Sequence, residues 1–134
     1  MNWRFAYTIG FHPWEDAATD APFVAKALEL FAREEIGRQP PYGPALDLGT
    51  GSGIWGIELA KRGWQVTGVD FVESALRRAH DRVRKAGVDM RLIHGDVTAL
   101  QAAGVEGRTS SLLPGVRLVV YCRAVVRLRR LRSE

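Results

Sequence analysis

Three acidic residues stand where short apolar runs end, and they are the side chains best placed to do chemistry. They are Asp47, Asp70 and Asp96. The apolar runs alternate with segments of helical periodicity, which predicts parallel strands, and the carboxyl ends of parallel strands meet at one edge of a sheet. We therefore expect the three carboxylates to converge on one crevice.

A glycine-rich turn follows the first of these acids. Residues 45–56 read Ala-Leu-Asp-Leu-Gly-Thr-Gly-Ser-Gly-Ile-Trp-Gly. Glycines let the backbone take left-handed dihedrals and approach a ligand closely, and the helix that follows presents unpaired N–H groups at its start. A strand, a glycine turn and a helix in this order are typical of a site for a nucleotide-like ligand.

Each acid suits a different contact with such a ligand. Asp70 lies 21 residues beyond Gly49, the separation at which an acid after the second strand reaches ribose hydroxyls. Asp96 is placed to accept from the exocyclic amine of a base, and Asp47 either fixes the turn or meets a ligand ammonium. Taken singly, Asp70 and Asp96 are equally suited to cap a helix. Their joint placement with the glycine turn favours the ligand site.

Two ligand classes compete for this turn. Residues 51–56 satisfy the pattern G-x-G-x-x-G of dinucleotide sites, which alone is a weak signal. Asp47 would repel a pyrophosphate, whereas it would attract a ligand that carries an ammonium and a sulfonium. The charge pattern therefore favours S-adenosylmethionine over NAD, and an NAD-binding oxidoreductase fragment is the alternative.

Periodicity and breaker residues indicate the elements that must position these side chains. Helices are expected at 20–36, 53–62 and 72–86, and strands at 45–48, 65–70, 90–94 and 116–122. Residues 1–18 are rich in aromatic side chains without a regular period, which indicates an irregular arm. The alternation predicts an α/β domain with a Rossmann-like, doubly wound parallel sheet.

The charge of the chain changes sharply near residue 104. Residues 1–103 carry a net charge of −1, whereas residues 104–134 carry seven arginines, two glutamates and no lysine. We therefore divide the chain into a cofactor-binding half-domain with its N-terminal arm at 1–103 and an atypical basic tail at 104–134, in which we expect the fourth strand and a short helix at 123–132. Nucleic acid is not an expected partner, because the basicity is confined to this tail.

Composition excludes several other classes of protein. The 46% hydrophobic and 25% charged residues are ordinary for a soluble globular protein, and no apolar run approaches the roughly 20 residues of a membrane span. The start lacks a secretory signal pattern, so we expect a cytoplasmic protein without a membrane partner. The single Cys122 forms no internal disulfide and offers no thiolate cluster, so no metal site is expected.

Three motifs resemble those of class I S-adenosylmethionine-dependent methyltransferases. They read Asp47-Leu-Gly49-Thr-Gly51-Ser-Gly53, Gly68-Val-Asp70-Phe71 and His94-Gly95-Asp96-Val97. In the arm, Pro13-Trp14-Glu15 is similar to the Pro-Trp-Asp opening of the thiopurine- and tellurite-methyltransferase-like branch, with Glu in place of Asp. The resemblance covers about residues 12 to 100 and implies methyl transfer from S-adenosylmethionine to a small-molecule acceptor.

The resemblance also implies a set of cofactor contacts. Asp70 would hold the ribose, Phe71 would flank the adenine, and Asp96 would contact the adenine edge. The full set of implied cofactor-binding residues is Trp14, Asp47, Gly49, Thr50, Gly51, Ser52, Gly53, Asp70, Phe71, Asp96 and Val97. No catalytic residue is assigned, because each histidine is better explained as a solvated or core side chain.

The sheet of that family has seven strands in the order 3-2-1-4-5-7-6, and this chain has room for about four. We expect the order 3-2-1-4, with the fourth strand as an open edge that invites pairing with another chain. A truncation or a reading-frame change near residue 104 would explain the missing strands and the arginine-rich tail. A non-catalytic cofactor-binding subunit is the remaining interpretation.

Overall fold

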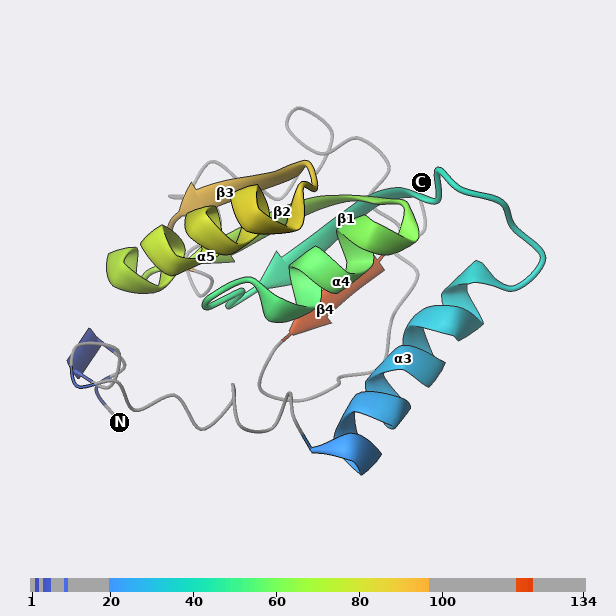
Figure 1. The fold of residues 1–134 in the computed structure, drawn as a ribbon, viewed down its shortest axis with the longest axis horizontal. Helices are drawn as coiled ribbons and strands as arrows, with labels where there is room; N and C mark the ends of the chain where they lie inside the picture. Colours follow the sequence, from blue (N-terminus) through green and yellow to red (C-terminus); the bar gives the residue numbers. More distant parts are fainter. Residues whose placement is uncertain (1, 3, 6–8, 10–19, 97–117, 122–134) are drawn as a thin grey trace.

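A four-stranded parallel sheet forms the centre of the fold, and all four strand arrows point the same way (Figure 1). The computed structural model describes residues 2, 4–5, 9, 20–96 and 118–121. The strands are β1 (Gly43–Leu48), β2 (Trp64–Asp70), β3 (Met90–His94) and β4 (Leu118–Tyr121). Their order, β3-β2-β1-β4, confirms the predicted order and the predicted Rossmann-like class.

Register places the carboxyl ends of the first three strands next to one another. Leu48 at the end of β1 pairs with Val69, and Asp70 at the end of β2 pairs with His94. Because both pairings are parallel, the loops that follow these strands leave the sheet at one edge. This edge carries the glycine turn.

Three helices are described: α3 (Ala21–Glu35), α4 (Ile54–Arg62) and α5 (Glu73–Ala86). Helix α4 joins β1 to β2, and α5 joins β2 to β3. Both end where a glycine was predicted to stop them, at Gly63 with φ 106° and at Gly87 with φ 65°. This left-handed backbone lets the N–H of Gly63 bond to the carbonyl of Ala60, which closes the last turn. None of the described helices is long and apolar enough to cross a membrane.

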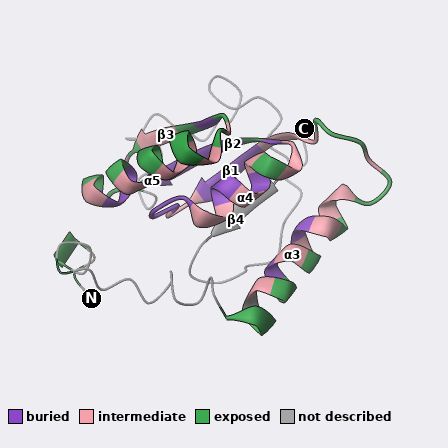
Figure 2. Ribbon diagram, viewed as in Figure 1, coloured by how far each residue is buried: buried purple, intermediate pink, exposed green. Residues whose placement is uncertain are grey.

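The apolar core lies between β1–β2–β3 and the helices. Figure 2 shows buried residues concentrated in β1 and β2 and recurring along α4, whereas α3 is mostly intermediate or exposed. The buried cluster consists of Phe31, Ala45, Ile57, Leu59, Trp64, Val66 and Met90. Helix α3 joins this core through Phe31, whose ring contacts Trp55 edge to face at a centroid distance of 6.2 Å.

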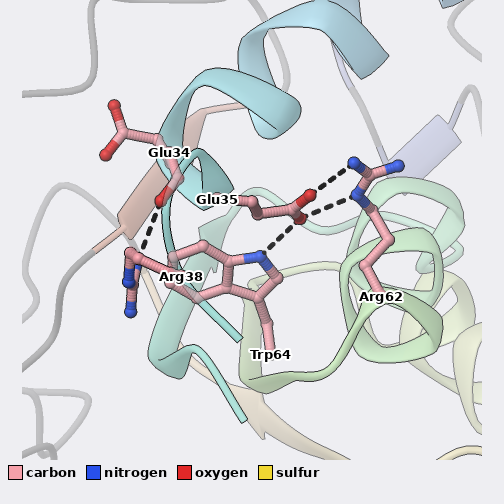
Figure 3. Close-up of polar contacts among 5 residues, drawn as sticks. All are labelled: Glu34, Glu35, Arg38, Arg62 and Trp64. Atoms are coloured by element: carbon pink, nitrogen blue, oxygen red, sulfur yellow. Dashed lines mark hydrogen bonds and ion pairs between the residues drawn. The ribbon is translucent and has the colours of Figure 1, made fainter. Parts of the chain in front are cut away.

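A polar cluster fastens the end of α3 to the turn between α4 and β2. The Glu35 carboxylate lies between Arg62 and the indole of Trp64 (Figure 3). The indole N–H donates to Glu35 Oε1 at 3.0 Å. Nearby, the guanidinium of Arg38 donates to the Glu34 carbonyl at 2.9 Å and lies over the Trp64 ring, 5.2 Å from its centroid.

The structure corrects the sequence prediction at the start of the chain. Residues 4 and 5 have helical backbone within a region expected to be irregular. The reason is local, because the side-chain oxygen of Asn2 accepts the N–H of Phe5 at 3.2 Å, as a helix-capping residue does. The expected strand at 116–122 is observed at 118–121. Trp14, Val97 and the rest of the tail lie outside the described residues, so the proposed break near residue 104 stays a prediction.

Candidate functional site

The glycine turn is fastened to the end of β2 by main-chain hydrogen bonds. The carbonyl of Val69 accepts the N–H of Gly49 at 2.8 Å and the N–H of Thr50 at 3.0 Å. Gly49, Gly51 and Gly53 all have left-handed backbone, with φ between 57° and 84°. Side chains rarely tolerate these dihedrals, which explains why glycine stands at all three positions.

Asp70 ties this turn to the start of α5. Its Oδ2 accepts the N–H of Gly51 at 2.8 Å, and its Oδ1 accepts the N–H of Val72, also at 2.8 Å. Asp70 therefore fixes the turn and holds Val72, the residue that precedes α5, but it is not the N-cap that the simpler interpretation expected, because the N-cap is Val72 and has no side-chain cap bond. A carboxylate offers about four acceptor positions, so two remain for hydroxyl donors.

Asp47 supports the same turn from inside the protein. The residue is 1% exposed, and its Oδ2 accepts the hydroxyl of Thr50 at 2.7 Å. Burial raises the pKa of Asp47 to about 7, and the charge of Asp70 raises it to a smaller degree. The hydrogen bonds from the Thr50 hydroxyl and the Gly56 N–H lower this pKa but do not offset the effect of burial. Of the two roles expected for this acid, the structure shows that it fixes the turn.

One oxygen of Asp47 is not satisfied by the described residues. Its Oδ1 is buried and has no hydrogen-bond partner among them. An unpaired buried acceptor is costly, so this oxygen is suited to receive a donor. The orphaned oxygen is an acceptor, so it fits a ligand that carries a donor such as an ammonium group.

Two further glycines make room beneath the turn. A Cβ at Gly68 would lie 2.8 Å from Thr50 Oγ1 and 2.6 Å from the terminal methyl of Met90. A Cβ at Gly56 would lie 3.0 Å from Asp47 Oδ2. Sequence reasoning quoted Gly68 only as part of a motif, although a glycine inside a strand is a general signal of close packing.

Sequence reasoning missed the role of His94. Its Nε2 lies 3.0 Å from the carbonyl oxygen of Phe71, and the next residue, Gly95, donates its N–H to the carbonyl of Asp70 at 2.8 Å. These bonds join the loops after β2 and β3. The motifs indicate only that the two loops are near each other, because the second and third motifs end neighbouring strands, and the contact itself depends on the register that the structure shows.

The structure brings together most of the predicted site residues. Asp47, Asp70 and the glycine turn are directly linked, and Phe71 stands at the rim of the same edge. Asp96 is exposed two residues beyond the end of β3. In the described part of the chain, no group of three His, Cys, Asp or Glu side chains is arranged to hold a metal ion.

Comparison with known proteins identifies the kind of domain. Residues 45–110 match the family described as "Methyltransferase domain". Ribosomal RNA small subunit methyltransferase C of Alcanivorax borkumensis is 36% identical over 55 residues, which are 41% of this chain and 17% of that protein.

Solved structures show the same fold. One of them comes from work on the conversion of a disulfide bond into a thioacetal group during echinomycin biosynthesis. Its TM-score is 0.56 at 26% sequence identity, and the match covers 72% of this chain and 35% of that chain. Coclaurine N-methyltransferase bound to N-methylheliamine and SAH has a TM-score of 0.50 at 23% identity, over 57% of this chain and 22% of that chain.

The chain spans less than two thirds of the length of each of these proteins. The family match supports the prediction of an S-adenosylmethionine-dependent methyltransferase domain. The branch within that class rests on residues 13–15, which lie outside the described part. Over residues 45–110 the chain is therefore similar to methyltransferase domains, and its sheet has the Rossmann-like strand order expected of the class I S-adenosylmethionine-dependent type.

Proposed function

We propose that this chain is the cofactor-binding half of an enzyme that transfers a methyl group from S-adenosylmethionine to a small-molecule acceptor in the cytoplasm. The observation that carries the proposal is the pair of buried acids at the glycine turn. Asp47 is 1% exposed and Asp70 is 7% exposed, and both are hydrogen-bonded to the turn. Acids so close to the turn favour a cationic ligand and disfavour a pyrophosphate.

The residues of the site would divide the cofactor among them. The turn would lie against the methionine part, with the free oxygen of Asp47 directed to its ammonium, and the remaining acceptor positions of Asp70 would bind the ribose hydroxyls. Phe71 would flank the adenine. The full set proposed is Trp14, Asp47, Gly49, Thr50, Gly51, Ser52, Gly53, Asp70, Phe71, Asp96 and Val97.

The charge distribution along the sequence supports a small acceptor over a nucleic acid. Residues 1–103, which contain the site, carry 12 basic and 13 acidic residues, a net charge of −1. Phosphate backbones are bound by clusters of cations, and the positive excess of this chain lies outside these residues. The relative from Alcanivorax is a ribosomal RNA methyltransferase, so RNA is included below as a test outcome.

A soft nucleophile such as a thiolate suits the site and the branch that residues 13–15 resemble. S-adenosylmethionine supplies an electrophilic methyl group on a sulfonium sulfur. A thiolate attacks this carbon in line with the carbon–sulfur bond, forms a thioether and releases S-adenosylhomocysteine. Because a thiolate is already ionised, alignment does most of the work and no protein base is required.

The edge of the sheet suggests how the rest of an acceptor pocket could be supplied. Among the described strands, β4 pairs with β1 alone, so its other edge has no strand partner there. We propose self-association through this edge, because an unpaired edge is a template for strand addition. Sedimentation analysis would show a dimer, and a strictly monomeric chain at high concentration would refute this part.

Calorimetric titration tests the cofactor assignment. We expect S-adenosylmethionine and S-adenosylhomocysteine to bind and NAD to give no heat. Binding of NAD without binding of S-adenosylmethionine would refute the assignment. Transfer of a labelled methyl group is then followed with small thiols and with ribosomal RNA as acceptors. Label on the thiol supports the proposed substrate class, and label on the RNA alone would refute it.

A further inference from the structure

We propose that His94 is a positioning residue that holds the ring of Phe71 in place to stack on the cofactor's adenine. The inference rests on the proposed function, because it concerns the same cofactor site. It gives a role to a side chain that neither the sequence motifs nor the acids of the site explain.

His94 continues the link between β2 and β3 where the main-chain pairing stops. Asp70 and His94 form the last pair of the two strands, and the N–H of Gly95 bonds to the carbonyl of Asp70 at 2.8 Å. One residue further, the carbonyl of Phe71 is bound by the imidazole at 3.0 Å. Since a carbonyl only accepts hydrogen bonds, Nε2 must carry the proton.

The backbone around Phe71 is thereby held on both sides. Asp70, which precedes it, is bonded to Gly51 through Oδ2, and Val72, which follows it, donates its N–H to Asp70 Oδ1. Val72 is 2% exposed and Asp70 is 7% exposed, whereas Phe71 is 36% exposed. The ring therefore stands out from a fixed and buried segment.

A large apolar ring carried on a fixed backbone is well placed to bind a flat partner. Aromatic side chains stack on bases of any kind, and a platform held before binding loses less entropy when the base arrives. Asp70, the acid proposed to hold the ribose, is the residue next to Phe71. A base joined to that ribose would therefore lie within reach of the ring.

His94 retains this hydrogen bond whether the imidazole is neutral or protonated, because Nε2 is a donor in both forms. Glutamine is the conservative replacement, since its amide nitrogen can donate at a similar reach. Alanine removes the donor, and because His94 is exposed, it leaves no cavity in the core. Arg91, exposed on β3 and distant along the strand from the site edge, supplies the control.

The test is a double-mutant cycle read as the dissociation constant of S-adenosylhomocysteine. We expect His94→Ala to weaken binding about three- to tenfold, in keeping with the loss of one hydrogen bond. His94→Gln should restore most of the affinity, and Arg91→Ala should leave it unchanged. In a Phe71→Ala background, adding His94→Ala should have little further effect, because the ring that His94 positions is already gone.

Each result decides the question. Additive losses in the cycle would show that His94 does not act through Phe71 and would overturn the proposal, as would wild-type affinity in His94→Ala. Failure of glutamine to restore binding would equally count against it. If the wild-type protein did not bind S-adenosylhomocysteine, the proposed function itself would fail. Thermal melting of the variants checks that each remains folded.

Discussion

Arg62 binds the carboxylate of Glu35 with two hydrogen bonds, from Nε at 2.8 Å and from Nη2 at 2.5 Å. The two residues are far apart in sequence, at the ends of α4 and α3, and Glu35 also accepts from Trp64. Their side chains are only 26% and 11% exposed, respectively. A bidentate, partly buried pair holds α3 against the body of the protein more firmly than a solvated pair would.

The first prediction concerns this pair. Glu35→Gln should lower the free energy of unfolding by about 1–3 kcal/mol, because it removes the charge-assisted bonds and leaves Arg62 partly buried without its counter-ion. Glu29→Gln is the matched control, since Glu29 pairs with Arg33 on the exposed side of the same helix. It should cost less than about 0.5 kcal/mol. Urea denaturation measures both, and equal effects would contradict the prediction.

The second prediction gives this pair an acid dependence. Burial alone would raise the pKa of Glu35. The hydrogen bonds from Arg62 and Trp64 and the charge of Arg62 outweigh this effect, so the pKa of Glu35 is lowered from its ordinary value of 4.5. A carboxylate with a lowered pKa stabilises the fold above its ordinary pKa, and that contribution is lost as the pH falls through the lowered value. The stability difference between wild type and Glu35→Gln should therefore shrink below about pH 4. A difference that persisted unchanged at pH 2.5 would argue against this charge effect.

The third prediction concerns Asp47 and has the opposite sign. Because folding raises its pKa from 3.8 to about 7, the native state favours the protonated form. This contribution is present at low pH and is lost as the pH rises through about 7. As the pH rises from 5 to 8, the free energy of unfolding should fall less in Asp47→Asn than in the wild type. Asp89 is an exposed acid just before β3, so Asp89→Asn is the control and should show the same pH dependence as the wild type. Parallel curves for wild type and Asp47→Asn would show that Asp47 does not titrate in this range.

The fourth prediction concerns the packing beneath the turn. Gly68→Ala should lower the free energy of unfolding by about 1–3 kcal/mol, because the added methyl group would overlap Thr50 and Met90. Gln65→Ala, at an exposed position of the same strand, is the control. Displacement of Thr50 should also weaken binding of S-adenosylhomocysteine. An unchanged melting temperature in Gly68→Ala would show that the site relaxes at no cost.

The fifth prediction separates the two roles of Asp70. Asp70→Ala removes the acceptor for Gly51 and Val72, so it should both destabilise the protein by about 1–2 kcal/mol and abolish cofactor binding. Glu73→Ala, on the exposed side of the first turn of α5, should do neither. Lower stability with unchanged affinity would leave Asp70 with the structural role alone, that of holding Gly51 and Val72.

Local signals explain which parts of the fold could be predicted. Gly63 and Gly87 ended their helices as expected, because a left-handed residue at a helix end is set by the residue itself. The order of the strands was expected from the resemblance to the methyltransferase family, and the sheet has that order. The Glu35–Arg62–Trp64 cluster could not be predicted, because its members come from separate elements and meet only once α3 packs against α4 and β2.

The candidate site was predictable to the same extent. The convergence of its acids with the glycine turn was expected from the motif spacing, whereas the hydrogen bond from Gly51 to Asp70 was not. The contact between His94 and Phe71 depends on the register of β2 and β3, and the sequence alone leaves that register open. The raised pKa of Asp47 depends on how completely the acid is enclosed, which no local pattern reports.

The strand order also has a consequence for how the protein folds as it is made. Strands β1, β2 and β3 follow one another in the sequence with a single helix between neighbours. Strand β4 also pairs with β1, but β2, α5 and β3 lie between these two strands in the sequence. Short loop closures are made faster than long ones. We expect the turn at Gly49–Gly53 to form while the C-terminal residues are still inside the ribosome, with β4 docking last.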